Sequence, residues 1–370
     1  MDLVDVARAF DAGRLTQARR IKAMTKTELA REVKVSAAAI GQYERGEVRP
    51  RADTIEALAS ALDVPVGFFA HGRPRAAVEV AEASFRRLRS TTVAQQQQAT
   101  AYVEQAWELS LYLEERVEFP ELDLPGWAYP DTGVGPDPIT AAQQLRVHWG
   151  LGVEPIPHLV AEIEQRGILT VFFSMKQDPA LPDKSRIDAF STTSLPRPLI
   201  VLTPDKADDV LRHRFSAAHE LGHIVLHHDR HGTDVEMERQ ADMFAAEFLT
   251  PRDALRPRLP SRLNLGALQE LSDEWGVSPH MLVRRSKDLE RFSESTARRA
   301  YITLNSLPER ARPISDYSGE TPELLRRAIE LLATVDVTLS EIADALQMTV
   351  RHVRRLAGME ADRPRLTLVR

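Results

Sequence analysis

Apolar positions recur at helical spacing along most of the chain, and only a short central stretch has the pattern of strands. Over residues 78–118 apolar side chains return every three or four positions with charged residues between them, which predicts a long helix. Short apolar runs rich in branched residues predict three strands at 168–173, 187–190 and 199–202. The predicted fold class is therefore mainly α with a small β-sheet.

Further helices are predicted on both sides of these strands, at 139–149, 155–166, 207–227, 236–249, 264–275, 278–290 and within 321–358. A stretch with five prolines and three glycines, 119–138, ends the long helix. These breaks divide the chain into an all-α N-terminal domain, a helical linker, an α+β domain and a C-terminal helical domain, at 1–72, 73–138, 139–295 and 296–370.

The amino-acid composition excludes several kinds of chemical site but says little about the fold. The 370 residues carry a net charge of −6 and no cysteine. Disulfides, iron–sulfur clusters, thiolate zinc sites and cysteine nucleophiles are thereby excluded, so a metal would need histidine and carboxylate ligands. No apolar run is long enough to span a membrane and the first residues lack the pattern of a signal peptide. We therefore expect a cytoplasmic protein with no membrane partner.

Residues 15–69 have the pattern of two short helices joined by a tight turn. Thr25 and Glu28 have the spacing of a capping box, and Ser36 is a suitable N-cap for a second helix that carries Ile40 inward. Such a pair predicts a helix-turn-helix unit, whose second helix presents its first residues outward. A small helical bundle that serves dimerisation is the alternative.

The same stretch resembles the Xre/Cro-type helix-turn-helix family, at Leu15, Arg19, Thr27, Glu28, Leu29, Ala30, Ser36, Ile40, Glu44, Gly46, Pro50, Leu58, Ala59, Leu62, Val64, Pro65 and Phe69. This resemblance implies a double-stranded DNA operator and a homodimer, with the 78–118 helix as a source of dimer contacts. It implies that five residues face the major groove, namely Ser36, Ala37, Ala38, Gly41 and Gln42. It also implies that three basic residues contact phosphates, namely Lys34, Arg45 and Arg49. Among the groove residues, Gln42 has the side chain that can bond adenine twice.

Six of the eleven histidines lie within residues 213–231. Two of them, His219 and His223, are four residues apart, so on a helix they share a face and can bind one ion. Glu220 follows the first and completes an H-E-x-x-H motif, in which the glutamate takes a proton from metal-bound water. Core histidines satisfied by hydrogen bonds are the alternative interpretation of this pair.

A third ligand is needed, and Glu238 is the preferred candidate. Asp242 lies one helical turn after Glu238, where it suits a supporting role, accepting the ring proton of a ligand histidine. Asp229 is a rival at the spacing of a different peptidase class, and Glu236 is a weaker one. For an oxyanion donor the histidines of the cluster are the local candidates, at His213, His227, His228 and His231.

Residues 139–292 resemble the ImmA/IrrE family of zinc metallopeptidases, in the stretches RIDAFS (186–191), PLIVLTPDK (198–206), RHRFSAAHELGHIVLHHD (212–229), ERQADMFAAEFLTP (238–251) and LSDEWGVSPHMLVRRSKDL (271–289). The resemblance implies a zincin-like fold, zinc on His219, His223 and Glu238, and Glu220 as the catalytic base. It also implies cleavage of a partner Xre-type repressor, which releases genes of a mobile element or a stress response.

Two questions stay open at the level of sequence. The chain is expected to hydrolyse a peptide bond in a repressor partner or in itself, or instead to be a non-catalytic Xre-type repressor or antitoxin whose zinc domain is structural or sensory.

The segment SEIADAL–QMT–VRHVRRL near the C-terminus has helix-turn-helix form and carries Arg351, His352, Arg354 and Arg355. It is either a second DNA-binding element or a helical domain with a basic face.

Overall fold

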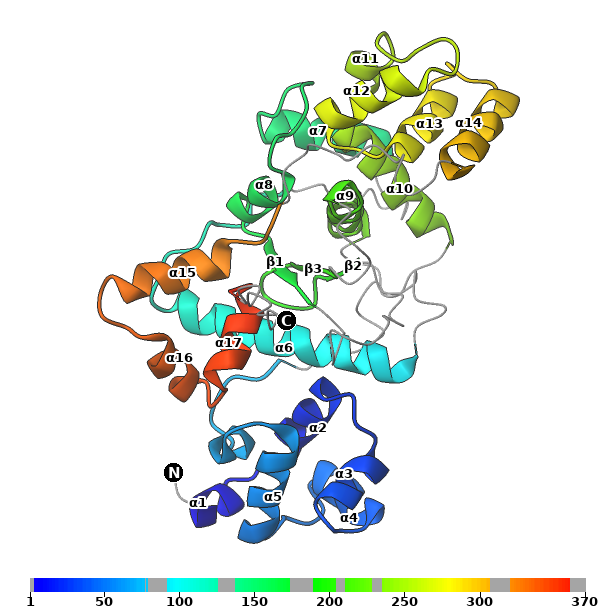
Figure 1. The fold of residues 1–370 in the computed structure, drawn as a ribbon. Helices are drawn as coiled ribbons and strands as arrows, with labels where there is room; N and C mark the ends of the chain where they lie inside the picture. Colours follow the sequence, from blue (N-terminus) through cyan, green and yellow to red (C-terminus); the bar gives the residue numbers. More distant parts are fainter. Residues whose placement is uncertain are drawn as a thin grey trace, which may run out of the picture.

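The computed structural model describes residues 3–76, 78, 92–125, 137–173, 189–203, 210–227, 235–306 and 320–359 (Figure 1). Within these ranges helices dominate, and the strands form one three-stranded sheet. The predicted fold class, mainly α with a small sheet, is confirmed. Among the described helices, none is long and apolar enough to cross a membrane.

The N-terminal domain is a bundle with its own core, built from α1 (Leu3–Arg8), α2 (Ala12–Ile21), α3 (Lys26–Glu32), α4 (Ala37–Glu44), α5 (Ala52–Leu62) and the 3-10 helix η1 (Val66–Phe69). The Thr25 hydroxyl accepts from the Glu28 amide, while the Glu28 carboxylate accepts from the Thr25 amide, so the predicted capping box is present. Ser36 caps α4 by accepting from the Ala39 amide. Each cap satisfies one of the amides that a helix start leaves without an intrahelical partner.

Helix α6 (Val93–Glu114) lies between the N-terminal domain and the sheet (Figure 1). Thirteen of its 22 residues are buried within this chain, which is why its hydrophobic pattern is not confined to one stripe. The predicted helix began at residue 78, but residues 79–91 lie outside the described residues. Its role in dimer contacts stays a prediction, since α6 serves here as the central element of a single chain.

The sheet consists of β1 (Leu169–Phe172), β2 (Ala189–Thr192) and β3 (Leu199–Leu202), in the order β1-β3-β2. Strands β1 and β3 are parallel, and β2 is antiparallel to β3 at one edge. Alternate residues face opposite sides of the strands. Val201 and Phe190 share a core with α6, whereas Ile200 and Ala189 share one with α9 (Val210–His227).

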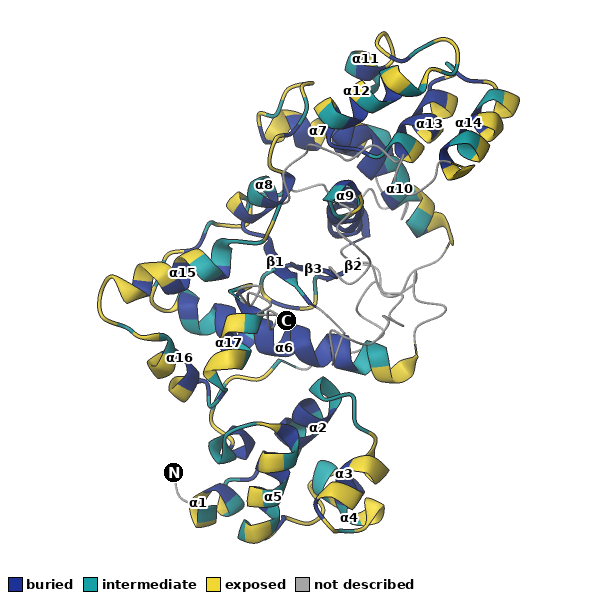
Figure 2. Ribbon diagram, viewed as in Figure 1, coloured by how far each residue is buried: buried dark blue, intermediate teal, exposed yellow. Residues whose placement is uncertain are grey.

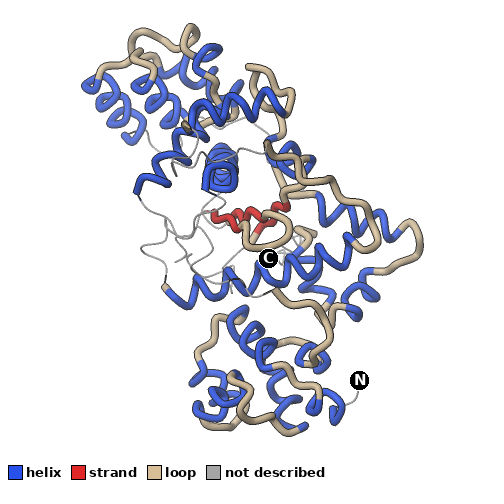
Figure 3. Tube along the Cα trace, turned by 180° about the vertical axis from the view of Figure 1, so that it is seen from behind, coloured by secondary structure: helices blue, strands red, loops and turns tan. Residues whose placement is uncertain are grey.

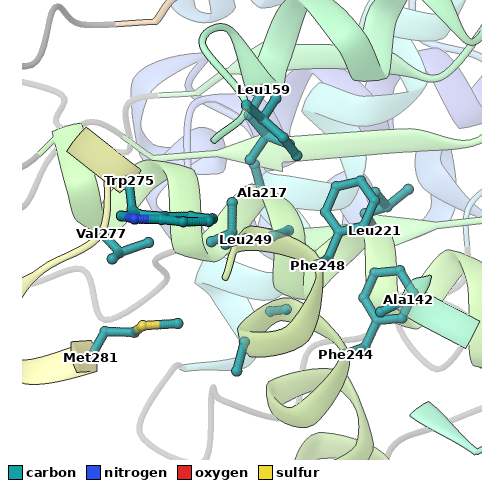
Figure 4. Packing of buried hydrophobic residues seen from close by; sticks show 14 of the residues in the cluster. Ala142, Leu159, Ala217, Leu221, Phe244, Phe248, Leu249, Trp275, Val277 and Met281 are labelled. Atoms are coloured by element: carbon teal, nitrogen blue, oxygen red, sulfur yellow. The ribbon is translucent and has the colours of Figure 1, made fainter. Parts of the chain in front are cut away.

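Seven further helices of the described part of the chain belong to the sheet's domain and lie on the α9 side of the sheet. They are α7 (Pro138–His148), α8 (Leu159–Gln165), α10 (Val235–Leu249), α11 (Arg252–Leu255), α12 (Leu265–Trp275), α13 (Pro279–Asp288) and α14 (Glu294–Ser306). Figure 4 shows Phe244 and Phe248 of α10 stacked close to Leu221 of α9. Helices α11 and α14 were not predicted. The buried positions of α14 include two alanines, Ala297 and Ala300, which give a weak hydrophobic signal.

The C-terminal helices α15 (Leu324–Ala333), α16 (Leu339–Ala345) and α17 (Val350–Leu356) pack into the same core as α6 and one face of the sheet. Seen from behind, the α6 layer separates the sheet from the N-terminal domain (Figure 3). The Tyr102 hydroxyl of α6 donates to the backbone oxygens of Phe172 and Arg355. One side chain therefore connects α6 with both the sheet and α17.

A buried ionic layer joins the N-terminal domain to α6. Arg14 of α2 donates to Glu108 of α6 at 3.0 Å, with side chains 1% and 2% exposed. Arg73 donates to the same carboxylate, also at 3.0 Å, and Gln17 donates to Glu104 at 2.8 Å. Burial lowers the pKa of Arg73 to about 10 and raises the pKa of Glu104. Such charges tolerate burial because each finds a partner.

We expect Glu108→Ala to lower the free energy of unfolding by about 3–5 kcal/mol, because it leaves two buried guanidinium groups without their carboxylate. Chemical denaturation measures this change. The control is Glu115→Ala at the end of the same helix, where Glu115 and Arg116 form an exposed pair whose loss costs no more than about 1 kcal/mol. Equal effects of the two substitutions would show that the buried ionic layer does not stabilise the contact between the N-terminal domain and α6.

Candidate metal centre and DNA-binding helix

Helix α9 carries the two histidines of the motif on its buried side. His219 and His223 are each 3% exposed and Glu220 is 5% exposed. The helix lies between the sheet and α10, and its apolar residues pack into the surrounding core. Because the two imidazoles are one turn apart, their Nε2 atoms come within 3.2 Å of each other.

Helix α10 brings Glu238 to this pair. Its carboxylate oxygens lie 3.6 Å from His219 Nε2 and 3.5 Å from His223 Nε2. A tetrahedral ion with bonds of about 2.0–2.1 Å holds its ligand atoms about 3.3–3.4 Å apart. The three residues thus form a group that could hold a metal ion, with one donor atom each, in the spacing that such an ion needs.

Gly222 permits the close approach of α9 and α10. A Cβ at this position would lie 3.0 Å from Phe244 Cδ1 and 3.3 Å from Ala241 Cα. Both contacts belong to α10, three or more residues beyond Glu238. A side chain at position 222 would therefore push α10, and the Glu238 carboxylate with it, away from the histidines.

Asp242 orients the first histidine. Its Oδ1 lies 2.9 Å from His219 Nδ1 and accepts the ring proton, while Oδ2 accepts from Arg284 of α13 at 3.0 Å. Burial lowers the pKa of His219, but the hydrogen bonds with Asp242 and Glu238 outweigh it and raise the pKa to about 9. Burial likewise raises the pKa of Glu238, yet the two imidazoles lower it well below its usual range. The site therefore has a strong preference for positive charge.

His227 orients the second histidine, a role that the sequence did not suggest. Its Nδ1 lies 3.1 Å from His223 Nδ1, and its Nε2 lies 2.9 Å from Gln240 Oε1. Because the amide oxygen accepts, His227 carries its proton on Nε2 and accepts the His223 proton on Nδ1. This relay leaves the lone pair of His223 Nε2 directed at the metal site, as Asp242 does for His219.

Ser191 of β2 contacts the motif glutamate. Its hydroxyl donates to Glu220 Oε2 at 2.7 Å, and it is 2% exposed. Ser191 faces α9 because it alternates with Phe190, which faces α6. The sequence placed Ser191 at the end of a matching stretch without giving it a role, since the contact joins a strand to a helix 29 residues away.

The rival ligands have other surroundings. Glu236 is exposed and pairs with Arg239 at 2.6 Å. Asp229, His228 and His231 lie outside the described residues. His213 lies near Phe172, with ring centroids 6.0 Å apart.

The residues expected to contact DNA lie on or beside α4. On α4 itself Ala37, Ala38 and Gln42 are exposed, whereas Gly41 is buried. The residues of the flanking turns are exposed as well, at Lys34, Ser36, Arg45 and Arg49. Arg45 pairs with Glu47 at 2.6 Å, and Arg49 donates to the Arg8 backbone oxygen at 2.8 Å. The outer face of α4 is therefore open, with short side chains and flanking arginines.

We expect Gly222→Ala to weaken zinc binding and to destabilise the chain by about 1–3 kcal/mol, because the new methyl group presses on α10. Titration calorimetry with zinc and denaturation of the metal-free chain measure the two effects. Gly266→Ala is the matched control, since a Cβ there would meet only Asn264 Oδ1, at an ordinary 3.5 Å. If Gly222→Ala binds zinc as the control does, the close helix contact does not set the ligand geometry.

Two family models match the chain. A helix-turn-helix model matches residues 15–69, which run from within α2 to the end of η1. The model of the IrrE N-terminal-like domain, a peptidase family, matches residues 163–287, from the end of α8 to α13. No curated protein matches the chain. Both resemblances found in the sequence are thus confirmed, because one part of the chain matches a helix-turn-helix family and another part matches the IrrE N-terminal-like domain family.

Proposed function

We propose that the chain is a cytoplasmic DNA-binding transcriptional regulator whose second domain is a zinc-dependent peptidase. The observation that carries the proposal is the convergence of His219, His223 and Glu238 within tetrahedral spacing, beside a buried Glu220. Three protein ligands leave the fourth position of a tetrahedral ion open, as catalytic zinc sites do.

The ligand set favours zinc over other divalent ions. Magnesium and calcium prefer six or more oxygen ligands, whereas imidazole nitrogens suit zinc. Asp242 and His227 each accept a hydrogen bond from the Nδ1–H of a ligand histidine, which keeps the proton on Nδ1 and leaves both Nε2 atoms free to bind. When bound, zinc supplies a Lewis acid that lowers the pKa of a coordinated water and polarises a peptide carbonyl.

Glu220 is the general base in this proposal. Its carboxylate accepts a proton from the attacking water and later delivers that proton to the leaving amine. The Ser191 hydroxyl donates to Oε2, so it fixes the rotamer of Glu220 and leaves Oε1 for the water. Ser191 is therefore a positioning residue, because it acts through Glu220.

The family resemblance suggests a protein substrate, either a partner repressor or the chain itself. The helix-turn-helix domain suggests a double-stranded operator, with α4 in the major groove. Because α4 presents mainly alanines, Gln42 is the residue proposed to read a base, and the flanking Lys34, Arg45 and Arg49 to hold phosphates. A homodimer fits such a domain, since its operators are typically palindromic.

We expect Glu220→Gln to abolish hydrolysis while zinc binding persists, because the amide keeps the shape of the carboxylate but cannot accept the proton. Zinc-loaded protein is incubated with a cell lysate, and new N-termini are identified by mass spectrometry; the intact mass of the chain reports self-cleavage. Ser191→Ala should retain zinc and slow cleavage about 10-fold, a part of the roughly 10²–10⁴-fold that general acid–base catalysis contributes. Ser191→Thr, which keeps the hydroxyl, should restore part of the rate.

The same experiment separates the proposal from its alternative. If wild type and Glu220→Gln yield the same N-termini, the peptidase reading fails. Loss of regulation in His223→Ala combined with full regulation in Glu220→Gln would favour a structural or sensory zinc in a non-catalytic repressor or antitoxin.

We expect Gln42→Ala together with Arg45→Ala to weaken operator binding about 10-fold or more, from one lost base contact and one lost phosphate contact. Operators are selected from random duplexes with the wild-type chain, and affinity is measured by fluorescence anisotropy. The control is Arg258→Ala, which removes an exposed arginine paired with Glu274 in the peptidase domain. Unchanged affinity in the double variant would exclude α4 as the recognition helix.

A further inference from the structure

The C-terminal helices repeat the geometry of the N-terminal helix-turn-helix in a constant register. The two turns of the first unit contain left-handed residues at Ala23 (φ 50°) and Lys34 (φ 57°). The C-terminal unit has left-handed residues at Asp336 (φ 64°) and Gln347 (φ 50°). Both pairs differ by 313 positions (336 − 23 and 347 − 34), so the same offset aligns the first turn and the second.

Hydrogen bonds and caps follow the same offset. In the second turn, the Val35 amide donates to the Ala30 oxygen at 3.0 Å, as the Met348 amide does to the Ala343 oxygen at 2.9 Å. The capping box on Thr25 recurs on Thr338. The N-cap serine of α4 is matched by an N-cap threonine of α17, at Ser36 and Thr349.

Burial follows the offset as well. The residues that hold α3 to α4 are buried, and so are their counterparts, in the pairs Leu29 with Ile342, Ala30 with Ala343, Val33 with Leu346 and Ile40 with Val353. Helices α15, α16 and α17 thereby correspond to α2, α3 and α4. These contacts set the angle between the two helices of the motif. The angle between α16 and α17 is therefore set by the same kind of contacts as the angle between α3 and the recognition helix α4.

A similar turn alone does not make such a unit. Gly276 (φ 62°) and the N-cap Ser278 join α12 to α13 in the same way. There, however, the outer residues of the second helix are engaged, because Arg284 donates to Asp242 and His280 contacts Asn305. The exposed side chains of Arg284 and His280 on α13 are therefore already paired within the chain.

The outer face of α17 is open and basic. Val350, Arg351 and Arg354 are exposed, at the positions that correspond to Ala37, Ala38 and Gly41 of α4. Among the described residues, neither arginine has an ion-pair partner. The opposite side of α17 faces α6 and the sheet, where His352 contacts Gln105 and Arg355 lies over the Phe173 ring. In Figure 2 the exposed residues of α17 lie on its outward side.

We propose that α15–α17 form a second helix-turn-helix that binds duplex DNA, with Arg351 and Arg354 directed into the major groove. Arginine makes paired hydrogen bonds to guanine, the commonest specific contact in that groove. The alanine-rich α4 lacks such side chains. The second unit thus supplies the direct base readout that the first unit provides weakly, and this division deepens the DNA-binding role proposed above.

The two units are held together, so we expect one chain to cover a longer site than one motif covers. A Cβ on Gly67 of η1 would overlap the Gln347 side chain, and Arg73 donates to the Leu346 backbone oxygen. Helix η1 packs on α1, α2 and α5. The turn of the second unit therefore contacts the N-terminal domain through η1 and leaves the outer face of α4 free.

The test uses the full chain with its first recognition helix blocked by Ala38→Glu, an exposed position where the carboxylate repels phosphates. Random duplexes are selected with the wild type, with Ala38→Glu, and with Ala38→Glu carrying Arg351→Ala and Arg354→Ala. We expect Ala38→Glu to enrich guanine-containing sites, and the two arginine substitutions to weaken binding to them about 100-fold, roughly tenfold for each contact. The slope of log affinity against log salt should also fall, if either arginine also neutralises a phosphate.

The charge-matched control replaces Arg298 and Arg299, two exposed arginines of α14, by alanine. Binding that survives Ala38→Glu, is lost with the α17 substitutions and is retained in the control supports the proposal. If the wild type enriches sites and Ala38→Glu enriches none, the proposed DNA binding by the second unit is wrong, whereas that by the first unit is supported. If Ala38→Glu and the wild type bind alike, the proposed DNA binding by the first unit is wrong, whereas that by the second unit is supported. An equal loss in the α14 control, or an unchanged affinity without Arg351 and Arg354, overturns the proposal.

Discussion

The candidate metal site depends on an electrostatic constraint. Two imidazole nitrogens lie 3.2 Å apart and a carboxylate faces both, and the two histidines are each only 3% exposed. Such a group is stable only if it gains positive charge, from a metal ion or from protons. The surrounding contacts supply the geometry for a metal ion, because Asp242 and His227 accept hydrogen bonds from the two Nδ1–H groups and Gly222 lets Glu238 approach.

A second set of buried polar groups connects the site's domain to the DNA-binding domain. Helix α6 meets the sheet through apolar side chains on one side and the N-terminal domain through the Arg14–Glu108 layer on the other. Tyr102 bonds to both β1 and α17. A linker that was predicted to be a separate segment is thus part of the core.

Local rules explain why helix-turn-helix units are visible in the sequence at both ends of the chain. A capping threonine, a glutamate three residues later and an N-cap hydroxyl after the turn act within one or two helical turns. The H-E-x-x-H motif is equally local, since the ligands at i and i+4 are fixed by the helix itself. Most helices and all three strands were predicted for this reason, whereas the alanine-rich α14 was missed.

The sequence by itself determined the fold class, the two domain types and the candidate ligands His219, His223 and Glu238, because periodicity and motif spacing are properties of short segments. The supporting role of Asp242 beside His219 was also predicted from the sequence. Only the tertiary structure decided which other groups support the site. Ser191 reaches Glu220 from a strand, Gln240 reaches His227 from the next helix, and Arg284 holds Asp242 from α13. These contacts depend on how helices and strands pack, and the amino-acid sequence carries no local pattern that reports such packing.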